Sequence, residues 1–195
     1  MQARYTQPVT RIVSGEFGGR NLAVPLKGTR PTSERVREAI FSRLDHYDAL
    51  EDTVVLDLFA GSGALAIEAL SRGAKSAVLV EAGQQAQSVC RQNLTTLGIT
   101  SARVVPDRAQ DFVARKQNEQ WDVVFLDPPY DFAQDELTQI LQALVPAVDD
   151  RAVIVIERPY RSPAPVLPEQ WRLIVDKKYG DTVVYYAEPD LELEN

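Results

Sequence analysis

The clearest chemical signal in this sequence is the segment Asp127-Pro128-Pro129-Tyr130, which directly follows an apolar run. Two prolines restrict the backbone, so the Asp127 carboxylate and the Pro128 carbonyl can face the same point. Two acceptors suit a planar amino group, because they hold both N–H bonds while the lone pair faces an electrophile. Asp127 could accept the released proton and Tyr130 could stack on a ring. We therefore predict that Asp127, Pro128 and Tyr130 are catalytic residues acting on an amine nitrogen.

A glycine-containing loop, residues 57–64, follows another apolar run. Gly61 and Gly63 allow a tight turn and let a ligand approach where a Cβ would exclude it. We expect Asp57, Phe59, Gly61 and Gly63 to bind a cofactor. Because the loop also satisfies the Gly-x-Gly-x-x-Ala dinucleotide fingerprint, it fits a nicotinamide cofactor and S-adenosylmethionine equally well.

Two more acids follow the next apolar runs. Glu81 closes the second run, and a carboxylate there suits the two hydroxyls of a ribose. Asp107 follows the third run, where it could accept a hydrogen bond from an adenine amino group. Asp111 competes with Asp107 for that role, and the sequence leaves the choice open.

The amine clamp decides between the two cofactors. A dehydrogenase has no use for two acceptors around an amine, and the only histidine, His46, lies too far upstream to supply its usual acid. We therefore predict S-adenosylmethionine as the cofactor. With one cysteine and one histidine the chain cannot supply a His/Cys metal cluster, so we expect no metal.

Alternating strand-like and helix-like segments must position these residues. Short apolar, mostly β-branched runs are typical of buried parallel strands, and helix-length segments separate them. This alternation predicts an α/β fold with helices on both faces of a mostly parallel sheet, completed by an antiparallel hairpin that turns at Gly180-Asp181. The expected strands are 54–59, 76–80, 102–105, 122–126, 152–156, 171–178 and 182–187, and the expected helices are 33–46, 64–72, 84–97, 108–116 and 133–145.

The two ends of the chain differ from this pattern. Residues 1–31 predict a short basic β arm with strands near 11–13 and 22–24, an appendage to the domain formed by residues 32–187. Residues 188–195 form an acidic tail without a nearby base, which we expect to be solvated and disordered.

Charge is distributed unevenly along the chain. The net charge is -7, yet residues 1–43 hold eight basic side chains against three acids, a local charge of +5. This basic segment could contact a polyanion. Since no segment approaches the roughly 18 apolar residues of a membrane span, we expect a cytoplasmic protein that does not contact membranes.

The sequence resembles class I S-adenosylmethionine-dependent methyltransferases that act on amino nitrogens, through the 57–63 loop, Glu81 and the 127–130 segment. More narrowly, it is similar to the RsmD family, and the matching stretches run from about residue 11 to residue 186. The stretches that carry this resemblance are Thr29-Arg30-Pro31-Thr32-Ser33-Glu34-Arg35-Val36-Arg37-Glu38-Ala39-Ile40-Phe41, residues 56–74, residues 125–130 and Tyr179-Gly180-Asp181-Thr182.

The resemblance implies a Rossmann-like methyltransferase that modifies the exocyclic N2 amine of a guanine in small-subunit (16S) ribosomal RNA. The target base must leave its stack. We expect the N-terminal arm with Arg30, Arg35 and Arg37 to contact the RNA, and we expect a monomer that acts on a small-subunit assembly intermediate. After Glu81 the chain has Ala82-Gly83-Gln84-Gln85 where relatives carry charged residues, so contacts on the adenine side can differ.

Other functions remain open at this point. A DNA adenine-N6 methyltransferase or a protein glutamine methyltransferase could use the same clamp, although the glutamine enzymes usually have Asn in place of Asp127. A dehydrogenase would need nicotinamide. A non-enzymatic S-adenosylmethionine-binding module would keep Glu81 but would not need Tyr130.

Overall fold

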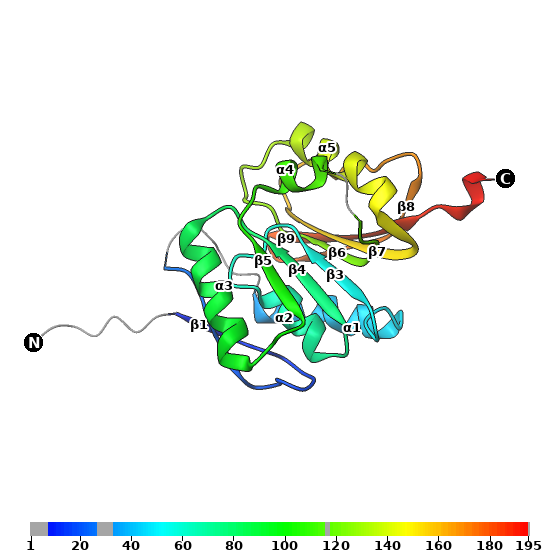
Figure 1. Cartoon of the computed structure of the whole chain (residues 1–195). Helices are drawn as coiled ribbons and strands as arrows, with labels where there is room; N and C mark the ends of the chain where they lie inside the picture. Colours follow the sequence, from blue (N-terminus) through cyan, green and yellow to red (C-terminus); the bar gives the residue numbers. More distant parts are fainter. Residues whose placement is uncertain (1–7, 27–32, 116–117, 195) are drawn as a thin grey trace, which may run out of the picture.

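The computed structural model describes residues 8–26, 33–115 and 118–194 and shows a central sheet covered by helices on both faces (Figure 1). The sheet within this described part has the strand order β5-β4-β3-β6-β7-β9-β8, and β9 pairs antiparallel with both β7 and β8 while the remaining pairs are parallel. This confirms the predicted α/β class. The strands are β3 (Val54–Asp57), β4 (Ser76–Val80), β5 (Ala102–Val105), β6 (Trp121–Leu126), β7 (Val148–Pro159), β8 (Trp171–Tyr179) and β9 (Thr182–Pro189).

The helices divide between the two faces of the sheet. Helices α1, α2 and α3 cover one face, and α4 and α5 cover the other (Figure 1). Helix α1 begins where the sequence predicted, because the Ser33 side chain accepts a hydrogen bond from the Val36 amide at 3.2 Å. The helices are α1 (Glu34–His46), α2 (Ala64–Ser71), α3 (Gln84–Leu97), α4 (Ala109–Ala114) and α5 (Gln134–Leu144), with short 3-10 turns η1 (Val145–Ala147) and η2 (Leu191–Glu194).

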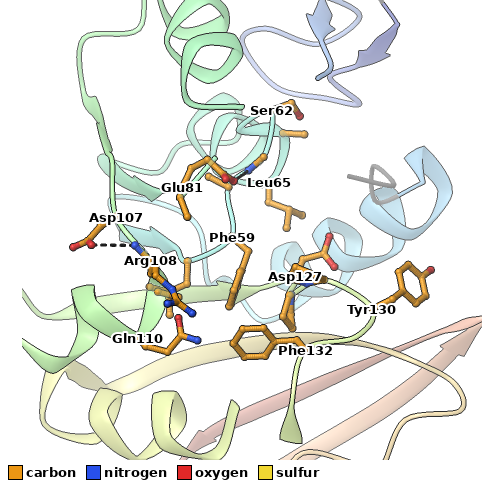
Figure 2. Close-up of a pocket in the computed structure, with 18 of the residues that line it drawn as sticks. Phe59, Ser62, Leu65, Glu81, Asp107, Arg108, Gln110, Asp127, Tyr130 and Phe132 are labelled. Atoms are coloured by element: carbon orange, nitrogen blue, oxygen red, sulfur yellow. Dashed lines mark hydrogen bonds between the residues drawn. The ribbon is translucent and has the colours of Figure 1, made fainter. Parts of the chain in front are cut away.

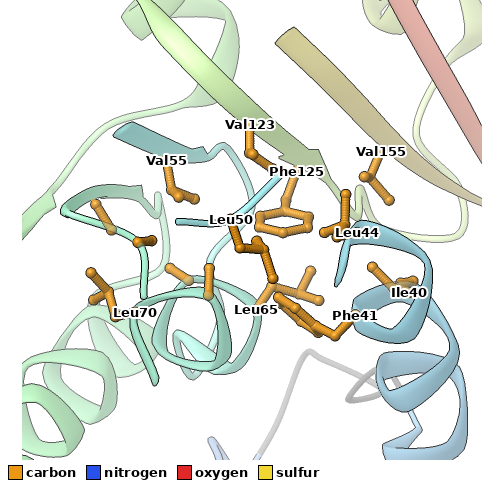
Figure 3. Packing of buried hydrophobic residues seen from close by; sticks show 14 of the residues in the cluster. Ile40, Phe41, Leu44, Leu50, Val55, Leu65, Leu70, Val123, Phe125 and Val155 are labelled. Atoms are coloured by element: carbon orange, nitrogen blue, oxygen red, sulfur yellow. The ribbon is translucent and has the colours of Figure 1, made fainter. Parts of the chain in front are cut away.

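Strand β6 is buried on both faces, as its continuous apolar sequence requires. Val123 and Phe125 face α1 and α2, whereas Val124 and Leu126 face α4 and α5. On the first face the Phe125 ring packs against Phe41 of α1 with ring centroids 5.7 Å apart (Figure 3). These contacts fix the end of β6, from which the 127–130 segment emerges.

Strand order reverses between β3 and β6. The chain moves outward from β3 through β4 to β5 and then returns to place β6 on the other side of β3. In open α/β sheets ligands bind outside the carboxyl ends of the strands at such a reversal. The fold therefore places the loops after β3, β4, β5 and β6 around one crevice.

The N-terminal arm is docked on the domain, and our expectation of an appendage is wrong. Its strands β1 (Val9–Arg11) and β2 (Asn21–Ala23) pair with each other, and their bounds lie one or two residues before the predicted ones. Ile12 and Leu22 are fully buried against Ile67 of α2 and against α3. Apolar burial of this kind holds the arm beside the loops of the crevice.

Buried polar groups also fix the arm. The Glu68 carboxylate of α2, itself fully buried, accepts hydrogen bonds from the amides of Val13 (2.7 Å) and Ser14 (3.0 Å). Gly15 passes so close to α2 that a Cβ would lie 1.8 Å from the Ser71 carbonyl oxygen, and its φ is +83°. Glycine is therefore required at this crossing.

The C-terminal end is more ordered than expected. Strand β9 includes Glu188, whose carboxylate pairs with Arg172 of β8 at 2.7 Å, so the expectation of an acidic tail without a nearby base is wrong for this residue. The turn η2 then covers residues that were expected to be disordered. Strand β7 is also longer than predicted, because its charged first half pairs only in part with β6 and lacks the apolar pattern used to find strands.

Candidate active site

A pocket of about 510 Å³, here called the large pocket, lies at the carboxyl ends of β3 to β6 (Figure 2). Its volume falls in the range of roughly 300–1,000 Å³ that is usual for ligand sites. It is lined by residues from the loops after all four strands and by Thr10 and Val24 of the arm. Four loops that lie far apart in sequence therefore share one cavity, at the place where the strand order reverses.

Glu81 is held in a fixed orientation at this pocket. Its Oε2 accepts a hydrogen bond from the Gly61 amide (2.8 Å), and its Oε1 accepts one from the Gly83 amide (2.7 Å). Both glycine amides thus aim the carboxylate, which lines the pocket and keeps further lone pairs for a ligand. The role of Glu81 on a ribose diol stays a prediction, and the structure places the carboxylate in the pocket where a ligand would lie.

The two glycines of the loop serve different purposes. Gly61 lines the large pocket, but Gly63 does not. A Cβ on Gly63 would lie 2.9 Å from Cys90 Sγ and 3.0 Å from a methyl carbon of Leu79, and its φ is +81°. Gly63 is therefore needed for packing and for the left-handed start of α2, which corrects our expectation that it lets a ligand approach.

Asp107 lines the large pocket, whereas Asp111 is exposed on α4 and is not among the lining residues. The Asp107 carboxylate accepts a hydrogen bond from the Arg108 amide (3.0 Å; Figure 2) and forms an ion pair with Arg115. Of the two acids that the sequence left open for an adenine amino group, only Asp107 is placed to reach a ligand in this pocket.

Aromatic rings form an apolar wall of the large pocket. Phe59 and Phe132 meet edge to face, with ring centroids 5.2 Å apart (Figure 2). The Phe132 carbonyl accepts hydrogen bonds from the guanidinium of the buried Arg158, at 3.2 and 3.3 Å. The sequence predicted Phe59 but missed Phe132, which the turn after Pro129 brings back to the pocket through the bond from the Phe132 amide to the Pro129 carbonyl (2.9 Å).

Asp57 lies beneath the pocket and does not line it. It is almost fully buried, and the backbone amides of Phe59 and Ala66 approach its carboxylate without reaching full hydrogen-bond geometry. Burial, followed by the nearby charge of Asp127, raises the pKa of Asp57 to about 7. The large pocket therefore stands over a buried carboxylate whose charged form is disfavoured by burial more than the nearby backbone amides stabilise it.

The 127–130 segment separates the large pocket from a second, smaller one of about 220 Å³, here called the small pocket. Asp127, Pro128 and Tyr130 line both pockets, and Figure 2 shows the Tyr130 ring turned away from Phe132. Tyr130 is half exposed. The predicted catalytic residues thus form a wall that two different ligands could reach from opposite sides.

The small pocket brings together segments that are distant in the sequence. Its walls come from the start of α1, the end of β7 and the turn between β8 and β9. Three of the four stretches that carry the RsmD resemblance meet in this pocket: residues 29–41, 125–130 and 179–182. The lining residues outside the 127–130 segment are Ser33, Val36, Glu157, Arg158, Pro159, Tyr179, Gly180, Asp181 and Thr182.

Known proteins with similar sequences identify the family. The profile of a family described as "Conserved hypothetical protein 95" matches residues 10–188. Ribosomal RNA small subunit methyltransferase D of Escherichia coli (strain K12) is 39% identical over 171 residues, which cover 87% of this chain and 85% of that protein. The protein of the same name from Haemophilus influenzae is 37% identical over 174 residues, covering 87% of this chain and 89% of that protein. The chain belongs to the RsmD family.

The solved structure of the Escherichia coli protein yhhF has the same fold as this RsmD-family chain. It superposes with a TM-score of 0.84 at 34% identity, covering 94% of this chain and 99% of that one. The resemblance found in the sequence is confirmed, and the chain is an S-adenosylmethionine-dependent methyltransferase.

The three arginines predicted to contact RNA have different positions in this RsmD-family structure. Arg30 lies outside the described residues, and Arg35 is exposed on α1. Arg37 is fully buried, so its predicted role as an RNA contact is wrong. Its guanidinium donates hydrogen bonds to Thr10 Oγ1 (2.9 Å) and to the Arg11 carbonyl (2.7 Å), and burial lowers its pKa. The docked arm covers this face of α1, which the helical pattern alone could not show.

No group of three or more histidine, cysteine, aspartate or glutamate side chains in residues 8–26, 33–115 and 118–194 could hold a metal ion. No helix in the same ranges is long and apolar enough to span a membrane.

Proposed function

We propose that this RsmD-family methyltransferase modifies the exocyclic N2 amine of a guanine in small-subunit ribosomal RNA. One observation carries the proposal: Asp127 and Pro128 line both pockets. An amine held by these two residues would face the methyl donor on one side, while its ring occupied the small pocket on the other. The relatives named ribosomal RNA small subunit methyltransferase D support the choice of RNA.

The large pocket suits S-adenosylmethionine in charge and in shape. The cofactor carries two positive groups, a sulfonium and an ammonium, and the pocket offers two acids for them, Asp57 beneath it and Asp127 in its wall. We assign Glu81 to the ribose hydroxyls and Asp107 to the adenine amino group. Phe59 and the amide-bearing loop at Gly61 would complete the walls around the nucleoside.

The clamp would make a weak nucleophile reactive. The lone pair of an exocyclic amine is delocalised into its ring, and hydrogen bonds from both N–H groups to Asp127 and to the Pro128 carbonyl would favour a tetrahedral nitrogen. S-adenosylmethionine supplies an electrophilic methyl group on a sulfonium that leaves as a neutral thioether. Asp127 would accept the proton that the nitrogen loses, and Tyr130 would stack on the extruded base.

The substrate would approach over the start of α1. Ser33 and Val36 line the small pocket, and the exposed Arg35 stands between them in sequence. We propose that Arg35 and the docked arm contact RNA phosphates beside the extruded base. The enzyme would act as a monomer in the cytoplasm, on a small-subunit precursor whose target guanine is still accessible.

Product analysis tests this function directly. The protein is incubated with radiolabelled S-adenosylmethionine and, in parallel, with undermethylated small subunits, naked ribosomal RNA, DNA and protein. The label is expected in N2-methylguanosine from the subunits. Label on another atom of guanine, on adenine or on glutamine would contradict the proposal, and the last two products are those of the rival enzymes that could use the same clamp.

A further inference from the structure

The small pocket contains a buried carboxylate that the reaction described above does not use. Glu157 is 5% exposed and lines this pocket near the end of β7. At about 220 Å³ the pocket lies below the roughly 300–1,000 Å³ that is usual for ligand sites, a size that suits a single base. A buried acid in a pocket for one base is a candidate for reading that base.

The register of the sheet places Glu157 beside Asp127. Leu126, the last residue of β6, pairs with Ile156 of β7, so Asp127 directly after β6 comes next to Glu157 of β7. Neighbouring strands lie about 4.8 Å apart. Side chains alternate between faces, and Phe125 and Val155 both face α1 and α2, so Asp127 and Glu157 share that face two residues further on.

Guanine presents a matching set of hydrogen-bond donors. Its N2 amine carries two N–H bonds, and its N1–H lies next to them on the same edge. If Asp127 and the Pro128 carbonyl hold the amine, the neighbouring carboxylate is placed to meet the next donor of that edge. We propose that Glu157 accepts the N1–H of the target guanine and thereby selects guanine over adenine; this rests on the proposed function at N2.

The chemistry of adenine explains the selectivity. Adenine carries an amine that the clamp could hold, but its N1 is an acceptor with a lone pair. A buried carboxylate facing that lone pair meets a second acceptor in place of a donor, which is strongly unfavourable. Glu157 therefore gives the small pocket a means of rejecting adenine that the clamp alone lacks.

The surroundings of Glu157 support this role. The buried Arg37 guanidinium lies close enough for the Glu157 charge to raise its pKa against the larger effect of burial, so a cation stands behind the carboxylate. The Tyr160 amide donates to the carbonyl of Asp181, a residue of the pocket lining, at 2.8 Å, and this bond fixes the end of β7 against the turn between β8 and β9.

The experiment removes the N1–H of the substrate together with the O6 carbonyl, and the Glu157→Gln variant distinguishes the two losses. Once the modified guanine has been mapped, small subunits are rebuilt with 2-aminopurine at that position, which keeps the N2 amine but has no N1–H. For the wild-type enzyme we expect kcat/KM to be at least about 100-fold lower on 2-aminopurine, as is usual where a buried polar group loses its partner. The amide of Glu157→Gln can donate to the N1 lone pair. For this variant we expect the values of kcat/KM on guanine and on 2-aminopurine to differ by no more than about tenfold.

The outcomes separate this inference from the proposed function. If the wild type methylated guanine and 2-aminopurine equally well, Glu157 would have only a structural role. The same would follow if Glu157→Gln lost activity on both bases to the same extent. In either case N2-methylguanosine would still be the product, and the proposed function would stand. Absence of label at N2 of guanine would overturn the proposed function itself. Glu188→Gln removes a carboxylate far from both pockets and serves as the control. It should prefer guanine over 2-aminopurine by the same ratio of kcat/KM as the wild type.

A binding measurement covers the case in which Glu157→Gln turns over neither base. Subunits with inosine at the target keep the N1–H and lack the amine, so they can bind without reacting. We expect them to inhibit the wild type more strongly than subunits with purine, which lack both groups, and we expect this preference to be lost in Glu157→Gln. Equal inhibition of the wild type by both would overturn the inference.

Discussion

Asp127 lines both pockets whereas Glu81 lines only the large one, and this difference predicts different kinetic effects. Asp127→Ala removes an acceptor of the amine and the proton acceptor, so we expect kcat to fall by about 10³-fold or more with the Kd for S-adenosylmethionine nearly unchanged. Glu81→Ala removes two charged acceptors from the ribose site, so we expect the cofactor Kd to rise about 10- to 100-fold. Single-turnover rates and calorimetric titrations measure the two quantities separately.

A conservative variant refines the prediction for Asp127. Asp127→Asn keeps an oxygen that can hold an N–H bond but cannot take the proton, so its kcat should lie between those of the wild type and Asp127→Ala. Near-normal turnover in Asp127→Ala would rule out the clamp. A cofactor Kd that rose as much in Asp127→Ala as in Glu81→Ala would show that the two acids share one role.

The buried Asp57 makes stability depend on pH. Its pKa in the folded protein is raised from 3.8 to about 7, so the folded state binds a proton that the unfolded state has lost between these values. The contribution to stability is complete below about pH 4 and is lost as the pH rises through 7, amounting to roughly 2–3 kcal/mol between pH 5 and pH 8. Urea unfolding without cofactor should show this loss in the wild type and a smaller one in Asp57→Asn. Equal pH dependence in the two proteins would mean that Asp57 does not titrate in this range.

Sequence reasoning found residues at strand ends and failed where orientation depends on packing. Glu81 and Asp127 were identified because the pattern of apolar runs fixes where each strand stops. Asp57, Gly63 and Arg37 satisfied patterns of the same kind, yet Asp57 lies below the pocket, Gly63 packs on Cys90 and Arg37 is covered by the arm. No local pattern could show this, because each orientation is set by an element distant in sequence.

Between elements, Asn93 of α3 connects the arm to the glycine loop. Its side chain accepts from the Ala23 amide (2.9 Å) and donates to the carbonyls of Ala23 (3.0 Å) and Ser62 (2.9 Å). Asn93→Ala leaves these buried groups without partners, so we expect the free energy of unfolding to fall by about 2–3 kcal/mol. Hydrogen exchange should accelerate at the Ala23 amide.

The neighbouring Gln92 provides the control for Asn93. It is exposed on the same helix, so Gln92→Ala should change neither stability nor exchange in the arm. If the Ala23 amide exchanged at the same rate in Asn93→Ala as in the wild type, the arm would be held by its apolar contacts alone.

Helices and strands were predicted well wherever the repeating pattern of apolar residues was long enough to recognise. The range 84–97 coincides with α3, and 76–80 and 102–105 coincide with β4 and β5. The arm strands are only three residues long, too short for a repeating apolar pattern. Nothing local therefore indicated that Ile12 and Leu22 are buried against α2 and α3. The docking of short strands is a tertiary property.

For the whole molecule, the positive charge available to RNA is less than the local +5 suggests. Arg37 is buried, and Arg11 is paired with Glu34. The exposed Arg35 beside the small pocket should therefore account for a measurable part of RNA binding. We expect Arg35→Ala to weaken RNA binding and to reduce the slope of log K against log salt concentration by about 1.

A second arginine serves as the control for this prediction. Arg151 is exposed in the first half of β7, toward the end of the sheet opposite the pockets. Arg151→Ala removes the same charge and should leave the salt slope unchanged. Equal slopes for Arg35→Ala and the wild type would show that RNA phosphates do not contact Arg35.

Two residues of the arm, Thr10 and Val24, belong to the wall of the large pocket. The sheet and its four loops form the rest of that wall, so a methyltransferase that shares the sheet but not the arm cannot present the same surface. A small molecule that fills the pocket and also contacts Thr10 and Val24 would discriminate between such enzymes. The arm thereby offers a basis for selective inhibition in a site whose remaining residues serve a widely used cofactor.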